Sequence, residues 1–148
     1  MGQHYLLSAA SRQLSLASVL QMTDQQALET FASLRWGGLD EQACPQCGVC
    51  RKHAFISTRN QWACKNCGHR FSVTSGTVFA NHKLRLQTLL GAIALFVHSA
   101  KGMSALQLSR SLDVQYKTAY VLFHKLRETL WQTQDETPLQ GEVEIDGA

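Results

Sequence analysis

The chain has 148 residues, enough for one ordinary domain or two small ones, and its 45% hydrophobic content is typical of a globular protein. Its longest apolar run, residues 89–97, is far shorter than the roughly 20 residues that a membrane helix needs. The N-terminal residues lack the basic start and long apolar block of a secretory signal. These features argue against a membrane protein and favour a cytoplasmic one.

The net charge of +3 conceals a strong segregation of charge along the chain. Residues 42–112 contain no Asp or Glu but nine Lys and Arg, whereas residues 135–148 contain five acids and no base. Because a solvated surface normally mixes both signs, the basic block indicates a polyanionic partner. Solubility alone is the simpler explanation that this pattern leaves open.

The first predicted element is an N-terminal helical segment over residues 1–38. Thr23 and Gln26 have the spacing of a capping box, which predicts a helix that runs to about Arg35 and stops at Gly37-Gly38. A shorter apolar turn around residues 16–20 is expected to pack against it. The predicted apolar face of the longer helix consists of Ala27, Leu28, Phe31 and Leu34.

Residues 39–82 contain all five cysteines, and four of them form two matching units, Cys44-Pro-Gln-Cys47-Gly48 and Cys64-Lys-Asn-Cys67-Gly68. Two residues between cysteines let one tight turn present both sulfurs to a metal, and the following Gly lets the backbone fold beneath them. The intervening stretch has room for one β-hairpin. This spacing predicts a zinc ribbon in which Cys44, Cys47, Cys64 and Cys67 hold one structural zinc.

Other interpretations of these residues are weaker. A reducing cytoplasm disfavours disulfides, and a rubredoxin-like iron site fits a basic chain of this length poorly. Cys50 precedes Arg51 rather than Gly, so we expect a spare thiol near the site. His53 and His69 could bind metal, but surface histidines are the simpler expectation.

Strands are expected around the metal. The composition of residues 71–79 predicts two short strands joined by a turn at Ser75-Gly76. Zinc should supply much of the folding free energy of so small a unit. Its basic loops, with Arg51, Lys52 and Arg70, are the candidate contacts to an anionic partner.

Three helices are predicted in residues 83–133. The first covers residues 86–99 and ends near Gly102, and a second capping box, Ser104 to Gln107, starts a short helix to Leu112. After a tight turn at Asp113-Val114, a longer helix is expected from Gln115 to about Trp131. Its predicted apolar stripe comprises Ala119, Phe123, Leu126 and Leu130, with Leu122 at the edge.

A short helix, a three-residue turn and a longer helix with a polar first face predict a helix-turn-helix, whose second helix enters the major groove of DNA. A plain three-helix bundle would show a similar polar face. The candidate DNA contacts on this helix are Gln115, Lys117, Thr118, Tyr120 and His124.

The last segment, residues 134–148, ends in GEVEIDGA. Alternation along an extended strand places Val143 and Ile145 on one side and the acids, including Glu144 and Asp146, on the other. No partner strand follows, so an orphan strand is expected. The predicted fold class is therefore α+β and mostly helical, with a small four-Cys zinc ribbon between an N-terminal helical segment and a helix-turn-helix unit.

The order of these parts resembles the front of a bacterial insertion-sequence transposase. The resemblance covers about residues 23–148 and is carried by CPQCG, WACKNCGHRFSVTSGTVF, KGMSALQLSRSLDVQYKTAYVLFHKLRE and GEVEIDGA. The chain is similar to the family that has a zinc-ribbon N-terminus and an ISXO2-like DDE catalytic domain. The resemblance implies that the four knuckle cysteines bind zinc and that Asp146 is the first catalytic carboxylate.

Two residues depart from the family pattern: Asp113 stands where Gly is frequent, and Gln115 where Ser is frequent. The resemblance also implies catalysis by two metal ions, such as magnesium, held by carboxylates from distant strands. Only Asp146 of that set is present here, so we expect this chain to bind DNA without strand transfer.

The resemblance thus predicts a nucleoid-associated protein that binds the terminal inverted repeats of a transposon, with a second copy or an intact transposase as a further partner. The alternative is a free-standing zinc-ribbon and helix-turn-helix transcriptional regulator, in which Asp146 has no role.

Overall fold

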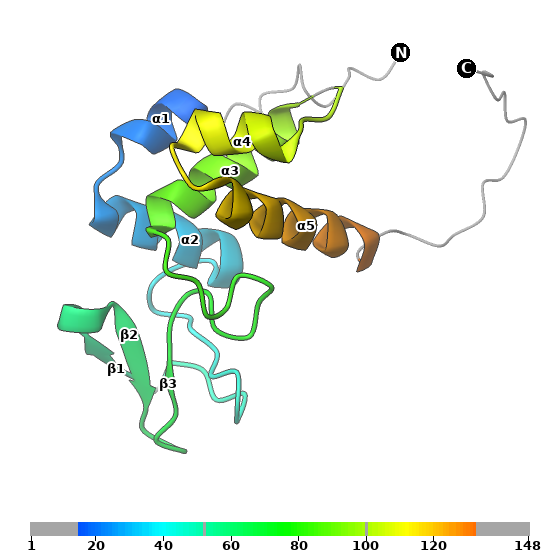
Figure 1. Ribbon diagram of the computed structural model, residues 1–148. Coiled ribbons are helices and arrows are strands. Elements are labelled where there is room, and N and C mark those ends of the chain that lie inside the picture. The colour runs from blue at the N-terminus through cyan, green and yellow to red at the C-terminus, as the bar shows by residue number, and fades with distance from the viewer. Residues whose placement is uncertain (1–14, 52, 100, 133–148) are drawn as a thin grey trace, which may run out of the picture.

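The computed structural model describes residues 15–51, 53–99 and 101–132. Figure 1 shows the helices gathered at one end of the molecule and a three-stranded sheet at the other, joined by the segment between α2 and β1 and by the segment after β3. The predicted class, mostly helical with a small sheet and a four-Cys cluster in the middle of the chain, is confirmed. The predicted orphan strand at 134–148 lies outside the described residues.

The two N-terminal helices are α1 (Leu16–Gln21) and α2 (Asp24–Trp36). The capping box of α2 is confirmed: Gln26 N donates to Thr23 Oγ1 at 3.3 Å, and Thr23 N donates to Gln26 Oε1 at 2.9 Å. Gly37 ends the helix in the left-handed conformation, at φ 83°. Local sequence therefore sets both ends of α2.

The buried face of α2 differs from the prediction at one position. Leu34 is 67% exposed, and Ala32 is buried in its place beside Ala27, Leu28 and Phe31. Leu34 lies at the edge of the apolar stripe, where none of the described elements covers it. The periodicity of a helix gives its apolar stripe but not how far its neighbours reach around it.

The sheet consists of β1 (His53–Ile56), β2 (Gln61–Cys64) and β3 (Arg70–Phe71), all antiparallel in the order β1-β2-β3. The hairpin between β1 and β2 contains a short 3-10 turn, η3 (Ser57–Arg59), and Asn60 in the left-handed conformation. The register pairs His53 with Cys64 and Trp62 with Phe71.

The predicted strand pair within residues 71–79 is wrong beyond Phe71. Consecutive turns follow β3, in which Ser75 N, Thr77 N and Ala80 N donate to carbonyls three residues earlier. Hydroxyl groups support these turns: Ser72 N donates to Ser75 Oγ at 2.9 Å, and Thr77 Oγ1 donates to Thr74 O at 2.6 Å. Ser and Thr side chains thus compete here for the backbone groups that a strand ladder would use.

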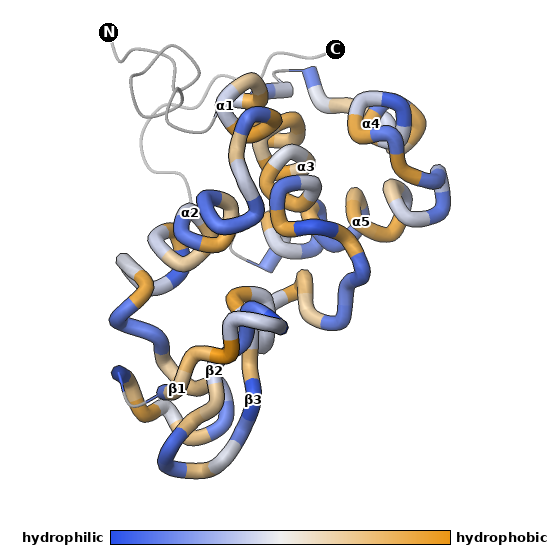
Figure 2. Tube along the Cα trace, turned by 90° about the vertical axis from the view of Figure 1, so that its left-hand side faces the viewer, coloured by the Kyte–Doolittle hydropathy of each residue, from blue (hydrophilic) through white to orange (hydrophobic). Residues whose placement is uncertain are grey.

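The remaining helices are α3 (Leu86–His98), α4 (Ala105–Leu112) and α5 (Tyr116–Gln132). All three were predicted, and α3 contacts α1, α2, α4 and α5. It is hydrophobic along most of its length (Figure 2), as a central helix must be. A Cβ at Gly91 would lie 3.2 Å from Leu112 Cδ2, so the absence of a side chain permits the close approach of α4.

The predicted stripe of α5 is rotated. Its buried residues are Ala119, Leu122 and Leu126, whereas Phe123 is half-buried and Leu130 is 59% exposed. The contacts of α5 with α3 and α4 decide this rotation. They select one side of an apolar stripe that is broader than the buried face.

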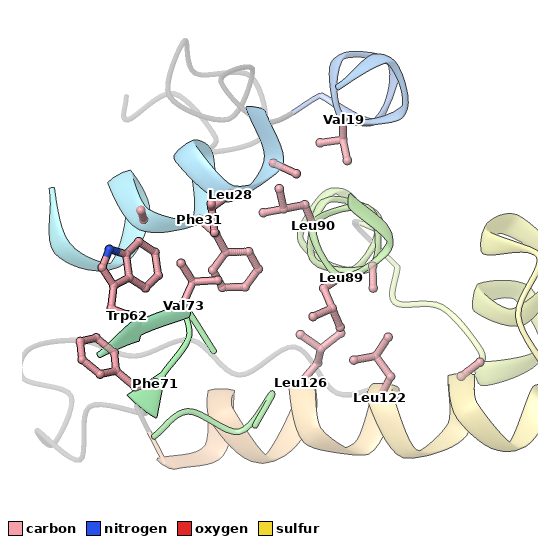
Figure 3. Close-up of a cluster of buried hydrophobic side chains, with 14 of the residues drawn as sticks. Val19, Leu28, Phe31, Trp62, Phe71, Val73, Leu89, Leu90, Leu122 and Leu126 are labelled. Atoms are coloured by element: carbon pink, nitrogen blue, oxygen red, sulfur yellow. The ribbon is translucent and has the colours of Figure 1, made fainter. Parts of the chain in front are cut away.

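One hydrophobic cluster connects the sheet to the helices. Figure 3 shows it running from Trp62 and Phe71 past Phe31 and Leu89 to Leu126. Residues on both sides of the predicted domain boundaries at 38/39 and 82/83 contribute to this core. The division into domains at these positions therefore stays a prediction. No helix within the described part of the chain is long and apolar enough to cross a membrane.

Candidate functional site

The two cysteine units adopt the same local structure. In the first, Gly48 has φ 70° and its N–H donates to Cys44 O at 2.9 Å; in the second, Gly68 has φ 71° and its N–H donates to Cys64 O at the same distance. A side chain would strain these positive φ angles. Each unit is therefore a tight turn that points two sulfurs the same way.

The turns bring four sulfurs together. The Sγ atoms of Cys44, Cys47, Cys64 and Cys67 all lie within 4.8 Å of one another. Cys44 Sγ lies 3.7 Å from Cys67 Sγ, and Cys47 Sγ lies 3.6 Å from Cys64 Sγ. A tetrahedral zinc with Zn–S bonds of about 2.3 Å places its sulfurs about 3.8 Å apart. The cluster predicted from spacing is confirmed, and its geometry and donor atoms fit a structural zinc.

The electrostatics of the cluster also point to a cation. A hydrogen bond from the Val49 backbone lowers the pKa of Cys47 to about 6, which favours its thiolate. The His69 backbone likewise favours the Cys67 thiolate, but desolvation and the neighbouring sulfurs of Cys47 and Cys44 raise its pKa to about 12. Four thiolates at these distances repel one another unless a metal ion neutralises part of their charge.

The other candidate ligands lie elsewhere. Cys50 is exposed, and its thiol donates to Gly48 O at 3.6 Å outside the cluster. His53 is half-buried rather than a free surface residue: its Nε2 lies 3.0 Å from Gln42 O, and its ring meets Phe71 edge-on. This packing could not be predicted from local spacing, because Phe71 on β3 and His53 on β1 meet only across β2.

A contact that the sequence did not reveal fastens the ribbon to α2. Arg35 Nη1 donates to Val73 O at 2.7 Å, and the Arg35 guanidinium lies over the Trp36 ring. Trp36 in turn meets Trp62 edge-on, with ring centroids 5.4 Å apart. The sequence marked Trp36 only as the end of a helix, although an aromatic residue there is a natural anchor.

Three of the candidate DNA contacts, Lys117, Tyr120 and His124, lie on the exposed side of α5, and Gln115 directly precedes the helix. Gln115, Lys117, Tyr120 and His124 are exposed, and Thr118 is half-buried. Tyr116, which was not predicted, is also exposed and forms a row with Tyr120 and His124, with centroid separations of 6.1 and 4.3 Å. Spacing of four residues between aromatic side chains could have found this row.

Two cations of the basic block, residues 42–112, are paired with acids, contrary to the expectation from the sequence. Arg51 forms an ion pair with Glu41, and Arg85, at the start of α3, pairs with Asp24 at 3.2 Å. No acid lies within the basic block, so its nine cations were expected to be unpaired. Glu41 and Asp24 lie outside the block in the sequence, and the fold brings them to Arg51 and Arg85. Arg70 is exposed on β3. Lys52, Glu144 and Asp146 lie outside the described residues.

Two cysteine knuckles on a three-stranded antiparallel sheet define a zinc ribbon. Residues 22–70 match the family model described as the transposase zinc-ribbon domain.

The chain is also 28% identical over 127 residues to the "uncharacterized protein in transposable element ISH50" of Halobacterium salinarum. That match covers 84% of this chain but only 41% of the relative. No solved structure matches the chain. These matches support the predicted resemblance to the N-terminal part of an insertion-sequence transposase.

Proposed function

We propose that the chain is the DNA-binding part of a DDE transposase and recognises the terminal inverted repeats of an insertion sequence. The family of the zinc ribbon supports a transposase-related role. The observation that carries DNA recognition is the exposed polar and aromatic face on the first turns of α5, next to that ribbon.

The connection between α4 and α5 supports a helix-turn-helix. Asp113 takes the left-handed conformation at φ 51°, as expected for a short polar residue in place of Gly. Val114 N donates to Ser109 O at 3.1 Å, and Ser109 Oγ donates to Val114 O at 2.7 Å. These bonds fix the turn between the two helices. Beyond the turn, α4 packs against α5.

In this proposal α5 lies in the major groove, which is about as wide as one helix. Lys117 provides a phosphate contact, whereas Gln115 can form paired hydrogen bonds with a base edge. Tyr120 and His124 extend the contact along the groove. Thr118 is the least accessible of the candidates and contacts DNA only at the edge of the interface.

The zinc would be held by Cys44, Cys47, Cys64 and Cys67, and it would supply folding free energy to the ribbon. For the parent transposase we propose Asp146 as the first of the carboxylates that hold magnesium. The 148 residues present here would bind transposon ends without cutting them, as a single chain or beside a second copy, in the cytoplasm at the nucleoid.

Salt-dependent binding to duplex DNA tests the proposal. Terminal-repeat DNA should shift at low salt, and the affinity should fall steeply as salt increases, because phosphate contacts release counterions. Lys117→Ala should weaken binding to all sequences and reduce the salt slope by about 1. Gln115→Ala should mainly reduce the preference for terminal-repeat over scrambled DNA.

Lys117→Arg is the matched control, because it retains the charge and should bind almost as the wild type does. A wild-type chain with full zinc content that shifts no duplex at low salt would refute the proposal. A clear preference for promoter DNA over terminal repeats would favour the regulator alternative.

A further inference from the structure

The segment from Asn81 to Arg85 connects the ribbon to α3 and has a hollow on each side. One hollow, of about 630 Å³, is lined by this segment, the turn that contains Arg59 and the loop 72–76. The other, of about 440 Å³, is lined by the same segment and by α5. Asn81, His82 and Leu84 line both, so the segment forms the ridge between them.

Positive charge is concentrated around this ridge. Arg59 and Arg85 line the first hollow, and Lys83, Lys117 and Lys125 line the second. Among the residues that line the two hollows, the only carboxylate is Asp24, and it is paired with Arg85. The second hollow is therefore lined by three lysines and by no acidic residue.

These cations are far apart in sequence, and the fold gathers them. His82 on the ridge and Lys125 on α5 line the same hollow. Burial lowers the pKa of His82, and the charge of Lys125 acts in the same direction. Lys83 is exposed, and Lys125, which also lines the second hollow, is half-buried. The start of α3 also lacks an acidic residue and a side-chain cap.

We infer that this ridge, with Lys83 and Lys125 beside Lys117, binds the phosphate backbone of the same DNA duplex whose major groove receives α5. The inference rests on the proposed function. Lys117 belongs both to the groove-facing end of α5 and to the second hollow. A strand that leaves the groove at Lys117 would therefore pass Lys125 and Lys83 and continue towards Arg59 on the ribbon.

These lysines act as sequence-independent contacts, because an ammonium group on phosphate neutralises charge without reading a base. The ridge would thereby set how the ribbon and α5 are positioned along one duplex. It also explains why a chain with two separate candidate DNA-binding units has basic residues in the segment between them.

The test measures the salt dependence of binding to terminal-repeat and scrambled duplexes. Lys83→Ala and Lys125→Ala should each reduce the slope of log affinity against log salt by about 1, and together by about 2. The preference for terminal-repeat DNA should stay unchanged. Lys101→Ala is the matched control: it removes one exposed charge at the opposite end of α3 and should leave the slope close to that of the wild type.

Zinc content and far-UV circular dichroism establish that each variant is folded, and Lys83→Ala changes an exposed side chain, so it provides a result even if Lys125→Ala is unstable. A wild-type slope in Lys83→Ala would overturn the inference. If Lys117→Ala still weakened binding, the proposed function would stand. Absence of binding by the wild type would overturn both.

Discussion

At the residue scale, the cysteine site follows from a short motif repeated twice. Each Cys-x-x-Cys-Gly unit makes the same turn, and each Gly supplies the positive φ that the turn needs. The four sulfurs then meet at distances that suit tetrahedral zinc. The fifth cysteine, Cys50, lies two residues from the first unit but is exposed and outside the cluster.

Substitution of single cysteines should separate ligands from bystanders. Cys64→Ser should reduce the zinc content from one ion per chain to nearly none, because Cys64 is buried within the cluster and three thiolates leave an incomplete site. Cys50→Ser should retain one ion. Metal analysis of the purified variants measures this directly, and equal losses in both would show that the ligand set is wrong.

At the element scale, side-chain caps determine where helices begin. Thr23 and Gln26 make both bonds of the capping box at the start of α2. Ser104 accepts from Gln107 N at 3.1 Å at the start of α4. Both starts were predicted, because a cap depends only on residues three apart in sequence.

Removal of the α2 cap should destabilise the protein measurably. Thr23→Ala deletes the acceptor for Gln26 N and should lower the free energy of unfolding by about 1 kcal/mol. Thr23→Ser keeps a hydroxyl acceptor and should lower it by much less. Urea denaturation followed by circular dichroism compares the two variants. Equal midpoints for Thr23→Ala and the wild type would mean that packing alone sets this helix end.

At the scale of the whole molecule, the ribbon and the helices share one core. Val73 follows the last strand and belongs to the same buried cluster as Phe31 and Leu89 (Figure 3). Arg35 also ties α2 to the backbone at Val73. Loss of the metal should therefore affect more than the sheet.

Zinc removal should lower the stability of the helices. A strong chelator should lower the thermal midpoint of the helical signal at 222 nm and change the fluorescence of Trp62, which is buried in the shared core. Cys64→Ser should show the lower midpoint with or without chelator. A fluorescence change with an unaltered helical midpoint would instead show that the ribbon unfolds by itself.

The sequence by itself determined the features that depend on near neighbours in the chain. These are the paired knuckles, the caps at Thr23 and Ser104, the left-handed turn at Asp113 and, within the described residues, the helices α2, α3, α4 and α5. Each arises from residues within a few positions of one another, so spacing and residue type suffice to predict it. The exception is the region after Phe71, where hydroxyl-supported turns replaced a predicted strand.

Only the tertiary structure decided the features that depend on distant partners. Leu34 and Leu130 are exposed because packing selects one side of each apolar stripe, which periodicity cannot specify. Arg85 is paired because the fold brings Asp24 to it from another helix. Lys83 and Lys125 converge for the same reason: the segment after the ribbon lies against α5, and no local pattern records that contact.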